Sequence, residues 1–216
     1  PIGRAAAYRV LGLLEADDRP GVGVGANGLP DIAWCDVNDD HEWTYQKEKR
    51  SALPPYKIAK YPITYRQFQA FIDAPDGWND SRWWKGLAAS EEHKSAPGEQ
   101  SFKFGNHPRE NVSWYDALLF CPRLRDLCKL PSCYKIKAQE RFVEKLAYNK
   151  DYTVDFDENA KGFRLPLEKE WEYAAKAGTE NRWPGTDDEG LLSEYAWCDQ
   201  DFDYECCEPV ATRTPN

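Results

Sequence analysis

The sequence of 216 residues contains no methionine and begins Pro1-Ile2. Because newly made chains start with methionine, we expect a fragment or a trimmed product. Histidine is also scarce, with 3 residues at His41, His93 and His107. They lie far apart, and none has a His or Cys neighbour at ligand spacing. We therefore expect each of them at the surface or in a loop, and not on a metal.

Long apolar runs and an excess of basic residues are missing as well. No stretch approaches the roughly 20 apolar residues that span a bilayer, so we expect no membrane partner. The 37 acidic residues outnumber the 28 basic ones, which gives a formal charge of −9. Nucleic-acid-binding proteins instead gather Lys and Arg on one face, so we expect no nucleic-acid partner. We expect a cytoplasmic protein. We also expect the natural start of the chain, where a signal peptide would stand, to be missing from this sequence.

Cysteine is present but lacks metal spacing. The 7 cysteines leave at least one unpaired thiol in a monomer, and the absence of a paired CxxC motif gives a structural zinc site little support. Cys121 falls on the apolar face of an expected helix, which favours a small core residue over a nucleophile. Two interpretations stay open for Cys206-Cys207: ordinary loop thiols, or a vicinal disulfide with a redox role.

Aromatic residues are abundant, and they indicate that the chain folds. The mean hydropathy of −0.78 is low enough to suggest disorder. However, the chain carries 9 Trp, 12 Tyr and 9 Phe, large apolar side chains that disordered proteins usually lack. We therefore expect a folded domain with an aromatic core.

Local patterns predict the elements of the first third of the chain. Apolar residues over 5–14 predict a helix, and the Gly-rich stretch that ends at Pro30 predicts a connector. Strand-like alternation covers 32–37 and 56–63. Thr64 is expected to cap a following helix whose apolar residues share one face, which favours a core role over a cofactor site. These apolar residues are Tyr65, Phe68, Phe71 and Ile72.

The middle of the chain is less regular. Residues 73–105 lack a helical or strand period and predict a long loop. Its tryptophans either cover a core or anchor a ligand. They are Trp78, Trp83 and Trp84. Ser113 and Asp116 then predict a capped helix, with a kink or a break at Pro122 because proline lacks the N–H that a helix interior needs.

Further along, residues 139–146 predict a short helix and 152–156 a strand. A third helix is predicted over 167–177. Its first-turn acids, Glu168 and Glu170, favour the positive end of the helix dipole, and we expect them to be solvated and not catalytic. The residues expected to be buried on this helix are Trp171, Ala174 and Ala175.

Three blocks, taken together and in order, resemble one family. They are YPITYRQF at 61–68, HP with NVSWYDA at 107–117, and GFRLPLEKEWEYAA at 162–175. With Pro209-Val210 after them, these blocks resemble the formylglycine-generating, sulfatase-modifying-factor domain. In that family a capping Thr usually stands where this chain has Leu167. Losing such a cap costs about 1 kcal/mol.

The resemblance implies a fold class and a division of the chain. The fold is α+β: an irregular, loop-rich C-type-lectin-like fold of the sulfatase-modifying-factor type, here with a short N-terminal helical appendage. We divide the chain into a helical segment with its Gly-rich connector at 1–29 and a sulfatase-modifying-factor-like domain at 30–216. We expect this domain to lack its C-terminal part.

The resemblance also implies an activity. Enzymes of the family bind copper through two cysteines and use oxygen to convert a substrate protein cysteine into formylglycine. Those two cysteines lie in the C-terminal part of the family domain, and this chain stops before the landmarks that surround them. We therefore assign no catalytic and no cofactor-binding residue, and copper is implied by the family alone, with its ligands not in this chain.

Calcium is the other metal that the resemblance suggests. Family members hold it with carboxylates and carbonyls in the loop before the Pro-Val pair. The corresponding loop here offers three hard oxygen ligands, Asp199, Asp201 and Asp203. Against this site, Trp197 stands where the family often has Asn, and alternating acids in a loop are usually only solvated.

Two functions from different classes remain. The first is an oxidase domain, catalytically incomplete in this chain, that acts on a protein cysteine. The alternative is a non-catalytic C-type-lectin-like module that binds a ligand or a protein, as effectors and diversified variable proteins do. In either case we expect the partner to be a protein or a peptide. The helix before Asp17 resembles the end of a helical-repeat module, which favours recognition.

Overall fold

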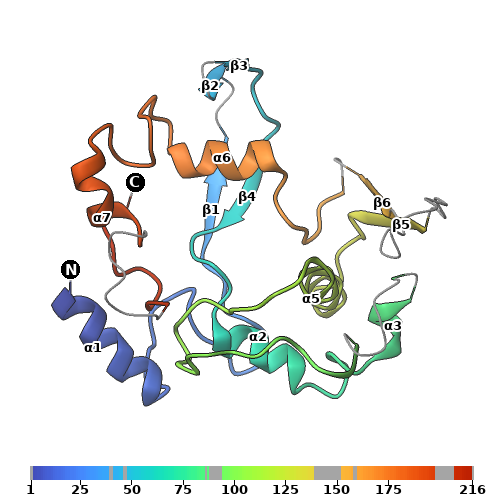
Figure 1. The fold of residues 1–216 in the computed structure, drawn as a ribbon. Helices are drawn as coiled ribbons and strands as arrows, with labels where there is room; N and C mark the ends of the chain where they lie inside the picture. The colour runs from blue at the N-terminus through green and yellow to red at the C-terminus, as the bar shows by residue number, and fades with distance from the viewer. Residues whose placement is uncertain are drawn as a thin grey trace, which may run out of the picture. The chain divides into compact units, whose positions relative to one another are not determined.

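The computed structural model describes residues 2–38, 41–45, 48–85, 87, 94–138, 152–157, 160–197 and 207–215. The described residues form short helices and three two-stranded antiparallel ladders joined by long connections (Figure 1). The helices are α1 (Ile2–Leu13), α2 (Tyr65–Ile72), α3 (Ser81–Trp84), α5 (Trp114–Leu127), α6 (Glu168–Lys176), the 3₁₀ helix η1 (Glu189–Leu191) and α7 (Leu192–Tyr195). The irregular, loop-rich α+β fold class is confirmed.

Each ladder pairs two short strands. They are β1 (Trp34–Val37) with β4 (Tyr56–Ala59), β2 (Trp43–Tyr45) with β3 (Glu48–Arg50), and β5 (Tyr134–Ala138) with β6 (Tyr152–Phe156). In the first ladder Trp34 lies opposite Ala59 and Val37 opposite Tyr56. The strands predicted at 32–37, 56–63 and 152–156 are therefore confirmed, although β4 ends before Pro62, which has no N–H for a ladder.

The chain folds into two compact units. The first comprises Pro1–Phe68, Gln100–Glu110 and Pro166–Asn216, and the second comprises Gln69–Glu99 and Asn111–Leu165. None of the described helices is both long enough and apolar enough to cross a membrane. The proposed division at residue 29 stays a prediction.

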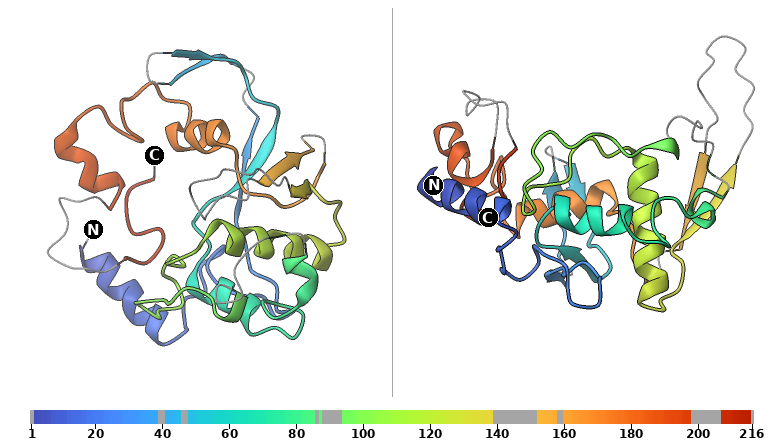
Figure 2. Two further views of the ribbon diagram at one scale, coloured as in Figure 1. Left: turned by 45° about the vertical axis from the view of Figure 1, so that its right-hand side comes forward. Right: turned by 90° about the horizontal axis from the view of Figure 1, so that it is seen from below.

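The first unit has a small aromatic core. Trp43, Leu53 and Tyr173 are buried together, and the Trp43 and Tyr173 rings meet edge to face at 5.3 Å. Helix α6 lies beside the β1–β4 ladder (Figure 1), where the Tyr56 hydroxyl donates to the Glu170 carbonyl at 2.6 Å. At the other side of this unit α1 runs close to the last residues of the chain (Figure 2), and Arg9 pairs with Glu208.

Helix α6 corrects two predictions. Trp171 is 58% exposed and Glu170 only 5% exposed, so the inward side of the helix carries Tyr173 and Glu170 and not Trp171. The buried Glu170 carboxylate accepts the Leu167 N–H at 2.8 Å, which supplies half of a capping box even without a capping hydroxyl. The helix ends at Ala177 in the left-handed region, with φ 48°.

Helix α2 confirms its predicted cap. The Thr64 hydroxyl accepts the Gln67 N–H at 3.3 Å, and the Gln67 side chain accepts the Thr64 N–H at 3.0 Å. This reciprocal pair satisfies two N–H groups that a helix start leaves unpaired. Phe68 and Phe71 are 3% and 0% exposed, so the aromatic stripe belongs to the core, as expected.

The second unit is built around aromatic rings. Phe71 meets Trp78 at 6.3 Å and Phe120 at 5.8 Å, and Trp78 meets Trp84 at 5.1 Å. The indole N–H groups of Trp83 and Trp84 each donate to a backbone carbonyl at 2.8 Å. The tryptophans of residues 73–105 therefore cover a core. The predicted loop is interrupted by α3, which Asp80 caps.

Helix α5 carries the predicted capping box of Ser113 and Asp116. Of the kink or break predicted at Pro122, the break is wrong, because α5 continues to Leu127, and the kink stays a prediction. An internal proline costs about 3 kcal/mol, and burial of side chains on both sides of it offsets that cost. Leu119 and Leu124, for example, are 0% and 5% exposed. The helix predicted over 139–146 lies outside the described residues.

Candidate functional site

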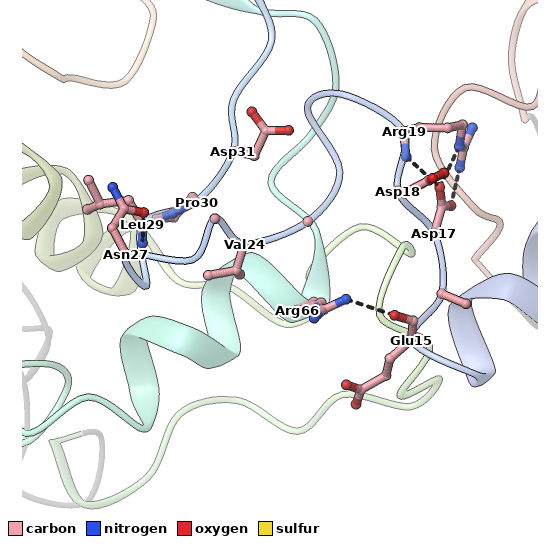
Figure 3. Close-up of a pocket in the computed structure, with 13 residues that line it drawn as sticks. Glu15, Asp17, Asp18, Arg19, Val24, Asn27, Leu29, Pro30, Asp31 and Arg66 are labelled. Atoms are coloured by element: carbon pink, nitrogen blue, oxygen red, sulfur yellow. Dashed lines mark hydrogen bonds and ion pairs between the residues drawn. The ribbon is translucent and has the colours of Figure 1, made fainter.

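A pocket of about 580 Å³ opens in the first unit, between the chain that follows α1 and the approach to β1 (Figure 3). Its lining comes almost entirely from one continuous stretch, with one side chain from α2. The lining residues are Glu15, Ala16, Asp17, Asp18, Arg19, Gly23, Val24, Gly25, Asn27, Leu29, Pro30, Asp31 and Arg66. The sequence-based prediction treated this stretch as a connector only.

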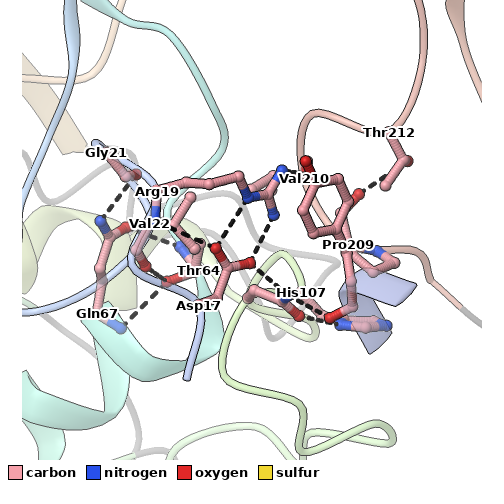
Figure 4. Close-up of polar contacts among 12 residues, drawn as sticks. Asp17, Arg19, Gly21, Val22, Thr64, Gln67, His107, Pro209, Val210 and Thr212 are labelled. Carbon is pink, nitrogen blue, oxygen red and sulfur yellow. Dashed lines mark hydrogen bonds and ion pairs between the residues drawn. The ribbon is translucent and has the colours of Figure 1, made fainter. Parts of the chain in front are cut away.

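One wall of the pocket is fixed by a buried ion pair. Asp17 accepts from the Arg19 guanidinium at 2.8 and 2.6 Å and from the Asn106 amide at 2.7 Å. Arg19 also donates to the Val210 carbonyl at 3.0 Å (Figure 4). Its guanidinium lies over the Tyr8 ring, 3.6 Å from the ring centre. Burial alone would raise the pKa of Asp17, but the hydrogen bonds from Arg19 and Asn106 outweigh burial and lower it.

The other wall is fixed by the side chains at the start of α2. The Gln67 amide donates to the carbonyls of Gly21 at 3.1 Å and Asp31 at 2.6 Å, and the Thr64 hydroxyl donates to the Val22 carbonyl at 2.8 Å (Figure 4). Gly21 has a φ of 88°, and a Cβ there would lie 2.6 Å from the Ala33 Cβ. This bend therefore requires glycine.

Charged groups face the pocket from several directions. Arg66 donates to the Glu15 carbonyl at 3.0 Å, and one Asp31 oxygen accepts the Gly21 N–H at 2.8 Å. The Glu15 and Asp18 carboxylates are exposed, and within the described part of the chain neither has a hydrogen-bond or ion-pair partner. Val24 and the Leu29-Pro30 pair add apolar surface (Figure 3). The pocket thus offers charges of both signs beside an apolar wall.

His107 is buried next to Asn106, the residue that donates to Asp17 in the pocket wall. It is 1% exposed, and its Nδ1 lies 3.0 Å from the Asn106 side-chain oxygen. Burial, with the nearby Arg9 charge, lowers the pKa of His107 to about 4. The ring is therefore neutral at physiological pH. His107 was predicted to lie at the surface or in a loop. It lies in a loop, but its side chain is buried.

The calcium site suggested by the sequence falls on a predicted loop that the structure does not describe. Asp199, Asp201 and Asp203 lie outside the described residues, so the calcium site stays a prediction. Within the described residues no three His, Cys, Asp or Glu side chains are placed to hold a metal ion.

The buried Cys121 thiol does not fit the copper pair that the family implies. Burial raises the pKa of Cys121 to about 12, whereas a metal ligand must be a thiolate. Cys121 is buried, which confirms its core assignment. Cys133 is also buried, Cys35 and Cys128 are exposed, and Cys207 is half-buried and hydrogen-bonds to the Glu110 side chain. None of these described cysteines lines the pocket, and Cys206 lies outside the described residues.

Sequence reasoning missed Asp17, Arg19 and Asn106. The signal that was present is the short stretch Asp17-Asp18-Arg19-Pro20-Gly21, in which an acid stands two positions before a base that is followed by a Pro-Gly bend. Such a stretch pairs its own charges locally and turns the chain.

Three known proteins are similar to this chain, two of them in structure and one in sequence. Treponema denticola variable protein 1 superposes with a TM-score of 0.61 at 29% identity, over 86% of this chain and 66% of that one. CarF superposes with a TM-score of 0.55 at 24% identity, over 86% of this chain and 74% of that one, which shows the fold alone. Chaperone protein LppX of Paenibacillus barcinonensis is 28% identical over 138 residues, or 62% of this chain and 41% of LppX.

The chain therefore spans less than half the length of LppX. The sequence model of the sulfatase-modifying factor enzyme 1-like domain matches residues 29–216, which include all three blocks noted in the sequence. Since that match covers most of the chain, this protein belongs to the sulfatase-modifying factor enzyme 1-like domain family.

Proposed function

We propose that this chain is a non-catalytic binding module that holds a protein or peptide ligand at the pocket formed by residues 15–31 and Arg66. The observation that carries the proposal is the pocket itself. Its volume of about 580 Å³ falls within the roughly 300–1,000 Å³ of typical ligand sites. Its lining supplies carboxylates, guanidinium groups and apolar surface, and no thiol or imidazole.

The walls of this pocket are preorganised, which favours binding. The side chains of Asp17 and Gln67 are 7% and 1% exposed, and both are fully engaged by hydrogen bonds to neighbouring segments. A site whose walls are already fixed loses less conformational entropy when a ligand binds. The two similar proteins named as a variable protein and as a chaperone support a recognition role more readily than an oxidase.

A pair of matched substitutions tests the proposal. Val24 lines the pocket, whereas Val10 is 55% exposed on α1 and lies outside it. We expect the wild-type chain to bind a subset of peptides on a random-sequence array, Val24→Trp to lose that binding, and Val10→Trp to retain it. Thermal unfolding of both variants checks that the fold is intact. Identical binding by wild type and Val24→Trp would contradict the proposal.

A second candidate is the oxidase, and the family match is the observation that favours it. Copper bound to thiolates would supply oxygen chemistry, but the buried Cys121 thiol does not fit that role and none of the described cysteines lines the pocket, so we derive no reaction step. The test is to incubate the chain with copper, oxygen and a cysteine-containing sulfatase peptide, and to trap aldehyde with a hydrazide probe. Copper-dependent aldehyde formation would replace the binding proposal with an enzymatic one.

A further inference from the structure

We propose that the pocket selects a lysine or arginine side chain of the bound peptide. This inference rests on the proposed function and names the ligand group that the pocket recognises. Three properties of the pocket carry it: the balance of charge, the spread of the carboxylates, and the apolar wall beside them.

The charge balance favours a cation. The lining holds four carboxylates and two guanidinium groups. Asp17 and Arg19 neutralise each other through two hydrogen bonds, so neither contributes a free charge. Three carboxylates then remain against the single guanidinium of Arg66, which is itself tied to the Glu15 carbonyl.

The carboxylates are too dispersed for a metal ion. A divalent cation needs several oxygen ligands at roughly 2.0–2.6 Å from one point. Within the described residues no three acidic, His or Cys side chains converge in that way. Figure 3 shows the Glu15 and Asp31 carboxylates on different sides of Arg66. Acids spread around a pocket suit an extended organic cation, whose flexible stem and several N–H donors reach separate partners.

The apolar wall points to the same ligand. Val24, Leu29 and Pro30 line the pocket beside the charged groups. Lysine and arginine bury their aliphatic stems along apolar surface while the charged head stays with carboxylates or water. A small inorganic cation gains no favourable contact from apolar side chains. The juxtaposition of apolar surface with free carboxylates therefore matches a long cationic side chain.

The test uses labelled five-residue alanine peptides whose central residue is arginine, lysine, citrulline or glutamate. Citrulline keeps the shape of arginine and lacks its charge. We expect the arginine and lysine peptides to bind at least roughly five times more tightly than the citrulline peptide, with the difference shrinking as salt is added. The glutamate peptide is expected to bind most weakly.

Two exposed carboxylates provide the variants. Glu15→Gln with Asp18→Asn removes the free charges that have no described partner, so folding is not threatened, and we expect about a tenfold loss of arginine-peptide affinity. Glu189→Gln, an exposed acid outside the pocket, is the matched control and leaves affinity unchanged.

The outcomes separate the two proposals. If the citrulline peptide binds as tightly as the arginine peptide, or the double variant keeps the preference, the inference is wrong. In that case the proposed function still holds if Val24→Trp abolishes peptide binding. If no array peptide and no test peptide binds the wild-type chain, both proposals are overturned.

Discussion

The two compact units hold their side chains in place by different means. The pocket region of the first unit relies on buried polar contacts, with Asp17, Arg19 and Asn106 linked by hydrogen bonds of 2.6–2.8 Å. The second unit relies on rings, with Phe71 and Trp78 packed edge to face. Ring packing stabilises mainly through the apolar area it buries, whereas a buried polar network requires a partner for each donor and acceptor. The pocket therefore lies in the region whose side chains are held by hydrogen bonds.

The largest expected effect lies in the aromatic unit. Trp78 is 1% exposed, so Trp78→Ala leaves a large cavity and should lower the free energy of unfolding by about 3–5 kcal/mol. Chemical denaturation followed by circular dichroism measures the loss. Trp171 is 58% exposed and provides the control: Trp171→Ala should change stability by no more than about 0.5 kcal/mol. Equal losses in both variants would mean that the aromatic cluster is not the core of its unit.

The polar region should respond to pH where the aromatic unit does not. His107 has a pKa lowered to about 4 in the folded chain, against roughly 6.5 when unfolded. The unfolded state therefore takes up the proton first, and stability present above about pH 6.5 is lost as the pH falls toward 4. The total loss is about 3 kcal/mol.

The measurement is urea denaturation between about pH 7 and pH 4.5, carried out on the wild type and on His107→Gln. The variant lacks the titrating ring, so its stability should fall less steeply over that interval, whatever its stability at neutral pH. Parallel pH profiles for the two proteins would show that His107 does not carry the dependence.

Asn106 tests the polar network directly. Its amide donates to Asp17 at 2.7 Å and to the Tyr8 carbonyl at 2.6 Å. Asn106→Ala removes both donors from buried acceptors, and the expected loss is about 1–3 kcal/mol. It should also weaken peptide binding, because Asp17 and Arg19 form one wall of the pocket. Asn38→Ala, at an exposed position, is the control for stability and binding. If Asn106→Ala lowers stability but leaves peptide binding unchanged, the polar network does not shape the pocket.

The contrast between the units also explains what the sequence could predict. Thr64 with Gln67, and Ser113 with Asp116, are three positions apart, so local spacing reveals their capping contacts. Asp17 and Asn106 are 89 positions apart, and no local pattern joins them. The aromatic core was readable from composition. The pocket was not, because its walls depend on partners that only the folded chain brings together.

Helix α6 shows a second limit of the same kind. Spacing alone made Trp171 the inward residue, but the structure turns Tyr173 toward Trp43 and leaves Trp171 exposed. Both residues fit an amphipathic helix, so what decides between them is the tertiary surface opposite, which helical periodicity does not contain. Glu170 was predicted to be solvated because it lies in the first turn, at the positive end of the helix dipole. It is instead buried, and its carboxylate accepts the Leu167 N–H.

The smallest expected effect comes from calcium, and it would show whether a metal also contributes to stability. With a dissociation constant of about 0.1–1 mM, millimolar calcium would stabilise the chain by roughly 0.4–1.4 kcal/mol and raise the midpoint of thermal unfolding by a few degrees. Replacing Asp199, Asp201 and Asp203 together with Asn should abolish that shift, and magnesium should not reproduce it. An unchanged midpoint in the wild type would rule out this site.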